Sequence, residues 1–454
     1  MHGSDLPGGG AAGPGSGDGR SGSAAPELRF EVEELTRVEG EGSLRLRMRG
    51  DEVVEARLNI FEAPRYFEQL VRGRTPDEVI DIVARICGIC PVAYQMSAVH
   101  AFEDLFGVQV DPEVRRLRRL FYCGEWLESH ALHVYLLHAP DFLGYDSAVA
   151  MARDLRPLVE RGLRLRRAGD AIIAAIGGRP IHPVSVRVGG FSRAPRRTEL
   201  AALRPLLEQA LDDAVATVRL AATFETPAME RVARLVSMRH PDEYPYNEGH
   251  IVSSDGLDIE LPAWRDAFSE YQVEGSNALY ARASDGSAYL LGPSARIALA
   301  ATQLHPLARR ELEATGLADE IAANIFRSVV ARGVELVHAA AEALELVEAY
   351  RPPDAALVPW TARPGTAAWA TEAPRGLLFH RYELDERGRI AEAQIVPPTS
   401  QNQAAIEADL RVFAPSVLRL SHVEAQRRLE QLVRSYDPCI SCATHFLDLT
   451  VEEA

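Results

Sequence analysis

Two Cys-x-x-Cys pairs are the residues of this chain best suited to chemistry. Cys87 and Cys90 form the first pair, Cys439 and Cys442 form the second pair, and Cys123 is the remaining cysteine. Two intervening residues allow both sulfurs of a pair to reach one ion. The sequence therefore predicts a four-thiolate metal site that joins the two ends of the folded chain.

The spacing of the pairs leaves the identity of the metal open. Structural zinc modules usually place their pairs about 15–20 residues apart, whereas most of this chain separates the two pairs. Thioredoxin-like redox motifs need a strand before and a helix after each pair, and the second pair lies too near the end of the sequence for that. Iron-sulfur clusters usually take their ligands from a compact run. Spacing alone leaves zinc and a redox metal as alternatives.

Composition narrows the function classes. The 454 residues include 49 Lys+Arg and 65 Asp+Glu, for a net charge of −16, which argues against nucleic-acid binding. No apolar run approaches the roughly 18–20 residues that span a bilayer. The Gly/Ser/Ala-rich segment 1–26 is expected to be a disordered tail and not a signal peptide. Five cysteines are too few for a secreted disulfide framework, so we expect a cytoplasmic protein.

Helices are expected to surround the first pair. Alternating residues predict strands at 30–35, 43–48 and 53–60, which form an N-terminal sheet. Thr75 is a predicted N-cap for a helix that runs towards residue 85. A second, mostly buried helix is expected over 91–106, so the first pair lies between two helices.

The rest of the chain is expected to be mostly helical α+β. The segment 240–300 is expected to be an inserted lobe within one domain covering 27–445, because no linker interrupts it. Further helical patterns occupy 111–138, 146–176, 197–235, 317–350 and 422–436. Short strands are expected at 270–274 and 288–291, and a hairpin at 375–383 and 389–396.

The residues around the cysteines resemble a known family. Arg85–Pro91 and Asp437–His445 resemble the two metal-binding motifs of the large (alpha) subunit of nickel-iron hydrogenases. Three more family segments follow the expected order: Arg37–Gly40, Gly177–Pro183 and Glu372–His380. These motifs are most similar to those of the cytoplasmic, bidirectional, NAD(P)-linked branch, which includes sulfhydrogenase alpha subunits. The resemblance implies a large-subunit fold with a central helix bundle and small peripheral sheets.

The resemblance assigns roles to the cysteines. It implies that Cys87 and Cys439 are terminal nickel ligands and that Cys90 and Cys442 bridge nickel to iron, which carries carbon monoxide and cyanide. The pocket for these iron ligands corresponds to Pro374, Arg375 and Thr399.

Arg375 and Glu39 are the implied catalytic side chains, together with Cys439. A guanidinium is permanently charged and could polarise dihydrogen, and Asp437 is its expected ion-pair partner. Glu39, on a glycine-flanked turn, is the candidate that takes a proton onward from the Cys439 thiolate.

A magnesium site is also implied near the C-terminus. Glu68 corresponds to a carboxylate ligand, Ile395 to a backbone carbonyl ligand and His445 to an imidazole ligand. Oxygen ligands suit magnesium, although histidine is unusual for it.

Several residues have supporting or departing roles. Tyr94 stands where many family members have a histidine that bonds the bridging sulfur, and Ser129 replaces an acid that faces the arginine in membrane-linked relatives. His182 belongs to the family segment Gly177–Pro183 and is expected to support the site. The remaining candidates are expected to serve packing or a proton network: Cys123, His130, His133 and His138.

The resemblance implies reversible cleavage of dihydrogen within a heteromultimer. Electrons would pass first to a small (delta-type) subunit with iron-sulfur clusters, then to diaphorase subunits with FAD and NAD(P). Nickel-insertion proteins and an endopeptidase would act in maturation, and the endopeptidase would remove 446–454. Two alternatives remain: a hydrogenase that reduces deazaflavin or feeds a disulfide reductase, and a non-catalytic scaffold with a structural four-cysteine zinc.

Overall fold

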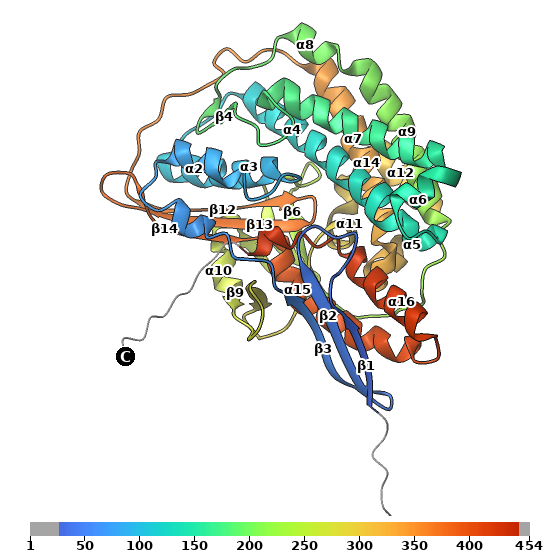
Figure 1. Cartoon of the computed structure of the whole chain (residues 1–454). Helices are drawn as coiled ribbons and strands as arrows, with labels where there is room; N and C mark the ends of the chain where they lie inside the picture. The colour runs from blue at the N-terminus through green and yellow to red at the C-terminus, as the bar shows by residue number, and fades with distance from the viewer. Residues whose placement is uncertain (1–26, 445–454) are drawn as a thin grey trace, which may run out of the picture.

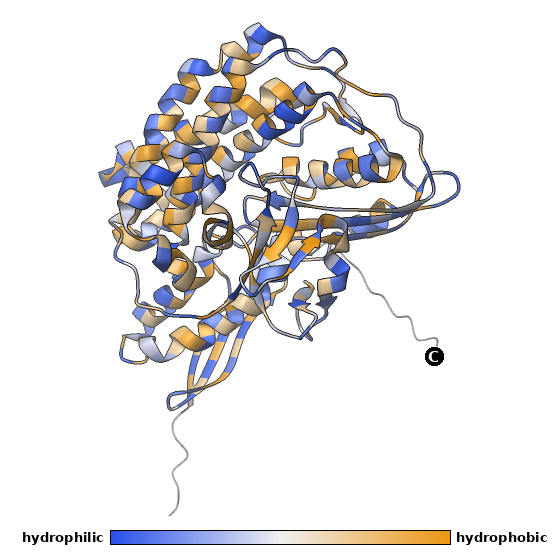
Figure 2. Cartoon of the chain, turned by 180° about the vertical axis from the view of Figure 1, so that it is seen from behind, coloured by the Kyte–Doolittle hydropathy of each residue, from blue (hydrophilic) through white to orange (hydrophobic). Residues whose placement is uncertain are grey.

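In the computed structural model, which describes residues 27–444, the chain begins with a three-stranded antiparallel sheet. Its strands are β1 (Glu27–Val32), β2 (Gly42–Arg49) and β3 (Glu52–Ile60). Figure 2 shows stripes of hydrophilic and hydrophobic residues along them, because successive side chains face opposite sides. The predicted sheet is confirmed, although its first strand begins three residues early. The predicted tail 1–26 and extension 446–454 lie outside the described residues.

Two helices flank the first pair, as predicted. α2 (Pro76–Val83) begins with a reciprocal capping box between Thr75 and Glu78. α3 (Pro91–Phe106) follows the first pair directly and ends at Gly107, which has a φ of 67°. Nearly every residue of α3 is buried, so the first pair is attached to a helix in the interior.

Long helices pack beside one another in the upper right of Figure 1. α4 continues into a π-helix over Leu132–His138. α4 and α7 approach closely at Gly124 and Gly169, since a Cβ on Gly169 would lie 2.3 Å from the Gly124 carbonyl oxygen. The long helices are α4 (Pro112–Ala131), α7 (Arg156–Gly177), α9 (Arg204–Ala222) and α14 (Ser328–Ala349).

Some helical predictions need correction. The helix expected over 197–235 is wrong beyond Ala222, where the chain leaves the helix before Pro227. A proline disfavours helical geometry in the residue before it. The helices expected over 146–176 and 317–350 are each interrupted, so α7 is preceded by α6 (Ala148–Asp154) and α14 by α13 (Ala318–Ala323).

α15 (Pro398–Val417) is a helix that the sequence pattern did not predict. Its first turns bury polar residues, including Gln401 and Asn402, so it lacks an obvious apolar stripe. α16 (His422–Ser435) is confirmed. The remaining helices are α1 (Phe67–Leu70), α5 (Ala139–Leu143), α8 (Arg197–Ala201), α10 (Trp264–Ala267), α11 (Pro293–Ala300) and α12 (Pro306–Thr315).

A second antiparallel sheet lies under α3. It contains β12 (Gly365–Ala373), β13 (Gly376–Leu384) and β14 (Ile390–Val396) in that order. Figure 1 shows these strands running below α2 and α3. The predicted hairpin is confirmed as β13 and β14, whereas β12 was not predicted.

Small strands occupy the region of the expected lobe. A four-stranded sheet has the order β11-β6-β7-β8, and β9 pairs with β10. No helix among residues 27–444 is long and apolar enough to cross a membrane. The strands are β6 (Arg234–Arg239), β7 (His250–Ser253), β8 (Asp258–Glu260), β9 (Phe268–Tyr271), β10 (Tyr280–Ala283) and β11 (Tyr289–Leu290), with a further two-residue pair, β4 (Val186–Arg187) and β5 (Gly190–Phe191).

Candidate metal centre

The four paired cysteines come together from opposite ends of the chain. The first pair precedes α3, and the second pair lies at the short 3-10 helix η5 (Ser441–Ala443). All four residues are buried, and their sulfurs lie within 4.8 Å of one another. The sulfur of Cys87 is 3.6 Å from that of Cys439, and the sulfur of Cys90 is 4.0 Å from that of Cys442. The structure therefore gathers both predicted motifs into one potential metal site.

The oxidation and protonation states of these sulfurs decide whether they can bind metal. Cys439 and Cys442 are joined as a disulfide, whereas Cys87 and Cys90 are free thiols. Because thiolates are the metal-binding form, a four-sulfur site requires the second pair in its reduced state. Burial opposes ionisation of Cys87, but hydrogen bonding with Cys90 and the charge of Arg375 lower the pKa of Cys87. Burial and the hydrogen bond with Cys87 raise the pKa of Cys90 well above its usual value.

A buried helix start holds the first pair. The N–H of Cys90 donates to the sulfur of Cys87 over 3.2 Å. Glu125, fully buried on α4, accepts hydrogen bonds from the N–H groups of Val92 (2.6 Å) and Ala93 (3.2 Å). These N–H groups lack partners within α3, so Glu125 acts as its cap. Nothing in the local sequence marks Glu125 as a site residue.

Side chains from distant segments hold the second pair. The Glu39 carboxylate accepts a hydrogen bond from the N–H of Ser441 at 3.0 Å. The N–H of Cys439 donates to the Thr399 hydroxyl oxygen at 2.9 Å. Gly40, with a φ of 87°, permits this approach, because a Cβ there would lie 2.8 Å from the Ser441 nitrogen. The structure thus places two predicted residues, Glu39 and Thr399, against the second pair.

Arg375 is buried beside the second pair. Its Nε donates to the Asp437 carbonyl at 2.8 Å, and its Nη2 donates to the Asp437 carboxylate at 3.0 Å. Its Nη1 lies 3.5 Å from the Ser129 hydroxyl. Burial opposes the charge, but Asp437 and the neighbouring thiols raise the pKa of Arg375 above its usual value. Arg375 is therefore a fixed positive charge next to the sulfurs.

A buried arginine fixes the loop that carries Pro374. The Nη2 of Arg296 donates to the Pro374 carbonyl at 2.9 Å, and the guanidinium pairs with Glu335 and Glu372. All three charged side chains have no exposed surface. Such a network is costly to disturb, because a partner left unpaired remains buried. Pro374 is thereby held rigidly beside Arg375.

Two buried carboxylates lie at the predicted magnesium site. Glu68 accepts a hydrogen bond from the N–H of Ile395 at 2.7 Å. Burial, followed by the charge of Glu270, raises the pKa of Glu68 to about 8, and burial raises the pKa of Glu270 to about 7. Glu270 accepts a hydrogen bond from Gln394 at 2.8 Å, while its other oxygen is buried without a partner among the described residues. Sequence reasoning missed Glu270, and His445 lies outside the described residues.

Comparison with known proteins identifies the fold that carries these residues. The chain matches the family described as nickel-dependent hydrogenase over residues 65–156 and 281–445, more than half of its length. The chain belongs to this family. It is 32% identical to the alpha subunit of sulfhydrogenase 1 from Pyrococcus furiosus, across 93% of this chain and 99% of that protein.

Further hydrogenases match nearly the full chain. The NAD-reducing hydrogenase HoxS subunit beta of Cupriavidus necator is 29% identical, across 92% of this chain and 95% of that subunit. A solved NAD+-reducing NiFe-hydrogenase in the H2-reduced state superposes with a TM-score of 0.84 at 27% identity, covering 93% of this chain and all of that chain. A NiFeSe hydrogenase of Desulfovibrio vulgaris Hildenborough, at 23% identity and a TM-score of 0.77, shares the fold. The predicted α+β hydrogenase large-subunit fold is confirmed.

Three other predicted residues of this hydrogenase lie around the sulfurs or apart from them. Tyr94 is in the first turn of α3, and its buried hydroxyl has no partner among the described residues. His182 is not brought to the sulfurs; its Nδ1 bonds the Ala84 carbonyl at 2.7 Å, just before the first motif. Cys123 is fully buried, as predicted, with its sulfur 3.7 Å from the Tyr246 hydroxyl.

The three histidines of the α4 region form no group with the cysteines in this hydrogenase. His130 lies 2.9 Å from the Glu335 carboxylate, and His133 bonds the Arg434 carbonyl at 2.8 Å. The rings of His133 and His138 stack with centroids 5.1 Å apart. Burial lowers the pKa of all three, so they are neutral at pH 7. The expectation of a buried polar network is met.

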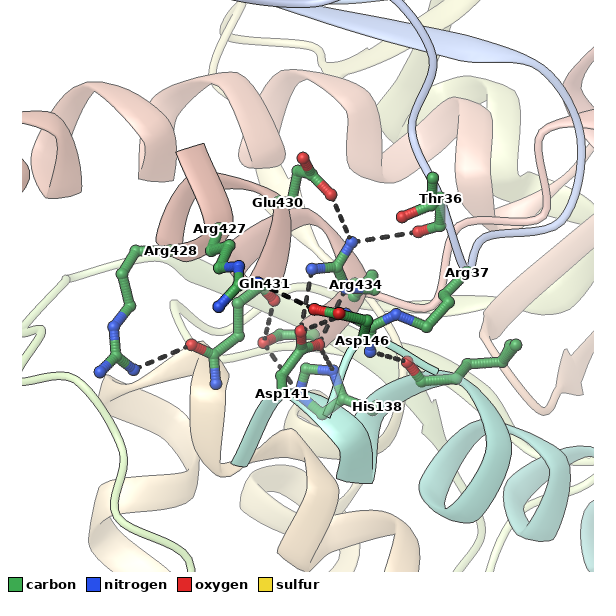
Figure 3. A network of polar contacts seen from close by, with 12 residues as sticks. Thr36, Arg37, His138, Asp141, Asp146, Arg427, Arg428, Glu430, Gln431 and Arg434 are labelled. Atoms are coloured by element: carbon green, nitrogen blue, oxygen red, sulfur yellow. Dashed lines mark hydrogen bonds and ion pairs between the residues drawn. The ribbon is translucent and has the colours of Figure 1, made fainter. Parts of the chain in front are cut away.

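An ionic cluster ties together segments that lead to the site. Arg434, at the end of α16, donates to the Asp141 carboxylate at 2.8 and 2.9 Å and to the Thr36 carbonyl at 3.0 Å. Arg37 also contacts Asp141, and Figure 3 shows the arginines converging on this carboxylate. The segment before Glu39 is thereby tied to the helix that leads to the second pair.

A second group of metal-ligand residue types is an ion-pair cluster. His240, Glu243 and Glu248 place ligand atoms within 4.8 Å of one another. Both carboxylates already pair with Arg115, and the Nδ1 of His240 accepts a hydrogen bond from the Asp242 N–H at 3.2 Å. These partners satisfy the groups that a cation would need.

Proposed function

We propose that this chain is the catalytic large subunit of a nickel-iron hydrogenase, which converts dihydrogen reversibly into two protons and two electrons. The observation that carries the proposal is the convergence of four buried cysteines from the two ends of the fold. Membership of the nickel-dependent hydrogenase family identifies the type of metal.

The donor set fits such a centre. In the proposed site Cys87 and Cys439 are terminal nickel ligands, and Cys90 and Cys442 bridge nickel to iron. Soft thiolates suit this metal pair. The sulfur positions support the division, because the two terminal sulfurs neighbour each other and the two bridging sulfurs neighbour each other. The unpartnered Tyr94 hydroxyl in the same buried region is a free donor for a bound group.

The iron ligands, carbon monoxide and cyanide, would occupy the pocket of Pro374, Arg375 and Thr399. The Thr399 oxygen accepts the hydrogen bond from Cys439, so its own proton remains free to donate. Arg375 adds charged N–H donors at a position fixed by Asp437. The pocket therefore combines rigid walls with few donors.

Proton transfer depends on three side chains. The nickel-iron centre supplies the site at which dihydrogen is split heterolytically. The sulfur of Cys439 receives the proton, and the carboxylate of Glu39, which already contacts the second pair, takes it onward. Arg375 keeps its charge throughout and stabilises the negative charge that develops as the bond polarises.

The buried carboxylates fit a structural magnesium ion. Glu68, the Ile395 carbonyl and His445 are the proposed ligands, and Glu270 is added by the structure as a neighbouring acid. Two acids whose pKa values are raised by burial favour a divalent cation that neutralises them. The unpartnered oxygen of Glu270 supports the same conclusion.

Electrons would leave through other subunits. All five cysteines are accounted for, so iron-sulfur clusters belong to a small subunit, and FAD and NAD(P) belong to diaphorase subunits. The similarity to HoxS subunit beta and to the NAD+-reducing structure supports this cytoplasmic, NAD(P)-linked branch. The F420-non-reducing hydrogenase of Methanothermobacter marburgensis, whose matching polypeptide is 29% identical, keeps other acceptors as the alternative. Rates with NAD+, NADP+, deazaflavin and a disulfide reductase separate these branches.

Maturation would complete the site. We propose one large-subunit domain over 27–445 with an inserted lobe at 240–300. Nickel-insertion proteins would load the metal before an endopeptidase removes 446–454. Mass spectrometry of the loaded complex is expected to show a chain ending at His445, and a chain still ending at Ala454 would contradict this step.

Metal analysis combined with infrared spectroscopy of the purified complex tests the function. We expect nickel and iron in equal amounts, together with bands from iron-bound carbon monoxide and cyanide. One zinc, no nickel and no such bands would instead support the scaffold alternative with a structural zinc.

A further inference from the structure

One arginine touches both halves of the candidate metal centre. The Nη2 of Arg65 donates to the Ile86 carbonyl at 2.8 Å and also to the Ser441 carbonyl. Ile86 immediately precedes Cys87, and Ser441 immediately precedes Cys442. Arg65 therefore connects the backbone of the first pair to the backbone of the second pair.

The main chain of Arg65 adds a further tie to the second pair. Its N–H donates to the Thr444 carbonyl at 2.6 Å, so Arg65 grips the second motif at two carbonyls. The guanidinium also lies over the Phe67 ring, 5.4 Å from its centroid, which restricts its position. A planar, permanently charged fork held in this way keeps a fixed distance between its acceptors.

The other side chains around the sulfurs each support one pair. Glu125 caps the helix that follows the first pair, whereas Glu39 and Thr399 bond the second pair. Those contacts set the shape of each pair but not the distance between them. The arrangement leaves that distance to Arg65.

We propose that Arg65 is a positioning residue that sets the separation of the two cysteine pairs and thereby the geometry of the metal centre. This inference rests on the proposed function, because a bimetallic centre needs both pairs at a fixed distance. Arg65 acts through Ile86 and Ser441 and touches no reacting atom.

Arg65→Met and Arg65→Lys test the proposal in the purified complex. Arg72→Met is the matched control, because Arg72 also joins a distant segment, through a 2.8 Å bond to the Ala391 carbonyl, but does so at an exposed position. The measurements are nickel retention against a chelator, the infrared bands of the iron ligands and the melting temperature. Nickel retention is expected to fall about tenfold in Arg65→Met, with shifted bands in the fraction that remains loaded.

Arg65→Lys is expected to be intermediate, because an ammonium keeps the charge but lacks the fork. It also keeps the proposal testable if Arg65→Met fails to fold. A purely structural role would lower the melting temperature without moving the bands, so unchanged bands and retention equal to Arg72→Met would overturn the inference. If the wild-type complex holds only zinc, the proposed function fails, and retention of that zinc in the same variants still decides the role of Arg65.

Discussion

The two cysteine pairs have the same spacing but are held in different ways. The first pair is continuous with a buried helix, α3, and its support comes from helix geometry and the single cap Glu125. The second pair lies in a loop and a single 3-10 turn, where Glu39, Thr399 and Arg375 with Asp437 supply the support. A rigid element and a set of discrete polar contacts thus meet at one site, and only the second set carries the proposed proton chemistry.

The difference separates metal binding from turnover. Changes to either pair of sulfurs should remove the metal, whereas changes to the polar contacts of the second pair should leave metal in place and slow the reaction. Changes to the helix cap of the first pair should mainly affect stability.

Replacing a sulfur should have the largest effect. Cys87→Ser and Cys439→Ser are expected to lose nickel and reduce hydrogen oxidation to background, because a hydroxyl is a poor ligand for a soft metal. Cys123→Ala, which removes the remaining cysteine, should retain both. Nickel content and hydrogen-dependent dye reduction are the measurements, and an active, nickel-loaded Cys439→Ser enzyme would contradict the ligand assignment.

Removing the proton acceptor comes next. Glu39→Gln keeps an oxygen for the Ser441 N–H but cannot take a proton, so hydrogen oxidation should fall by about 10²–10⁴-fold. Infrared bands and nickel content should stay as in the wild type. Glu41→Gln, in the same exposed turn, is the control. Equal rates for Glu39→Gln and Glu41→Gln would show that the proton leaves by another route.

Shortening the fork beside the second pair should cost less. Arg375→Lys keeps a positive charge but cannot reach both the carbonyl and the carboxylate of Asp437, and we expect a loss of about 10²–10³-fold in kcat. Arg387→Lys, on an exposed turn, should be neutral. A variant with full kcat and retained metal would assign Arg375 to the ion pair alone.

Changing the helix cap should mainly affect stability. Glu125→Gln keeps one acceptor for α3 but directs an NH2 group at the other N–H, which leaves a buried donor unsatisfied. The free energy of unfolding should fall by about 1–3 kcal/mol, while the loaded enzyme keeps its kcat. Chemical denaturation alongside Glu113→Gln, on the same helix, measures the effect. A large loss of kcat would mean that the first pair also takes part in turnover.

Magnesium removal should give the smallest effect, at the carboxylates near the second pair. The pKa values of Glu68 and Glu270, raised to about 8 and about 7, mean that the folded chain binds these protons more tightly than the unfolded chain does. That stabilisation is complete below the usual glutamate pKa and is lost as the pH rises through about 7–8. The melting temperature in chelator should therefore fall over this range, and added magnesium should restore it.

Two results would limit the magnesium account. Glu270→Gln should flatten the fall in melting temperature, because one of the two buried acids is removed. Identical melting curves with and without magnesium at about pH 8 would contradict a cation at this site.

Local signals in the sequence predicted one side of the comparison better than the other. Thr75 and Gly107 mark helix ends by their residue types, so the supports of the first pair were largely predictable. α15 was missed because its buried face is built from polar residues such as Gln401, which hide the apolar period. The contacts of the second pair depended on motif resemblance, as for Glu39 and Thr399.

Contacts that exist only after folding could not be predicted. Glu125, Glu270 and Arg65 become site residues because other segments of the chain are brought to them, and their neighbours in sequence carry no sign of this. The loss of helix after Ala222 also depends on a proline that the periodic pattern outweighed.

Nickel-edge X-ray absorption of the purified complex tests the central claim most directly, because it reports the ligands of the metal itself. The four gathered cysteines predict a nickel ion with sulfur ligands from both pairs and an iron neighbour at short distance. Nickel surrounded by nitrogen and oxygen, or sulfur-bound nickel without an iron neighbour, would contradict a bimetallic centre held between the two ends of the chain.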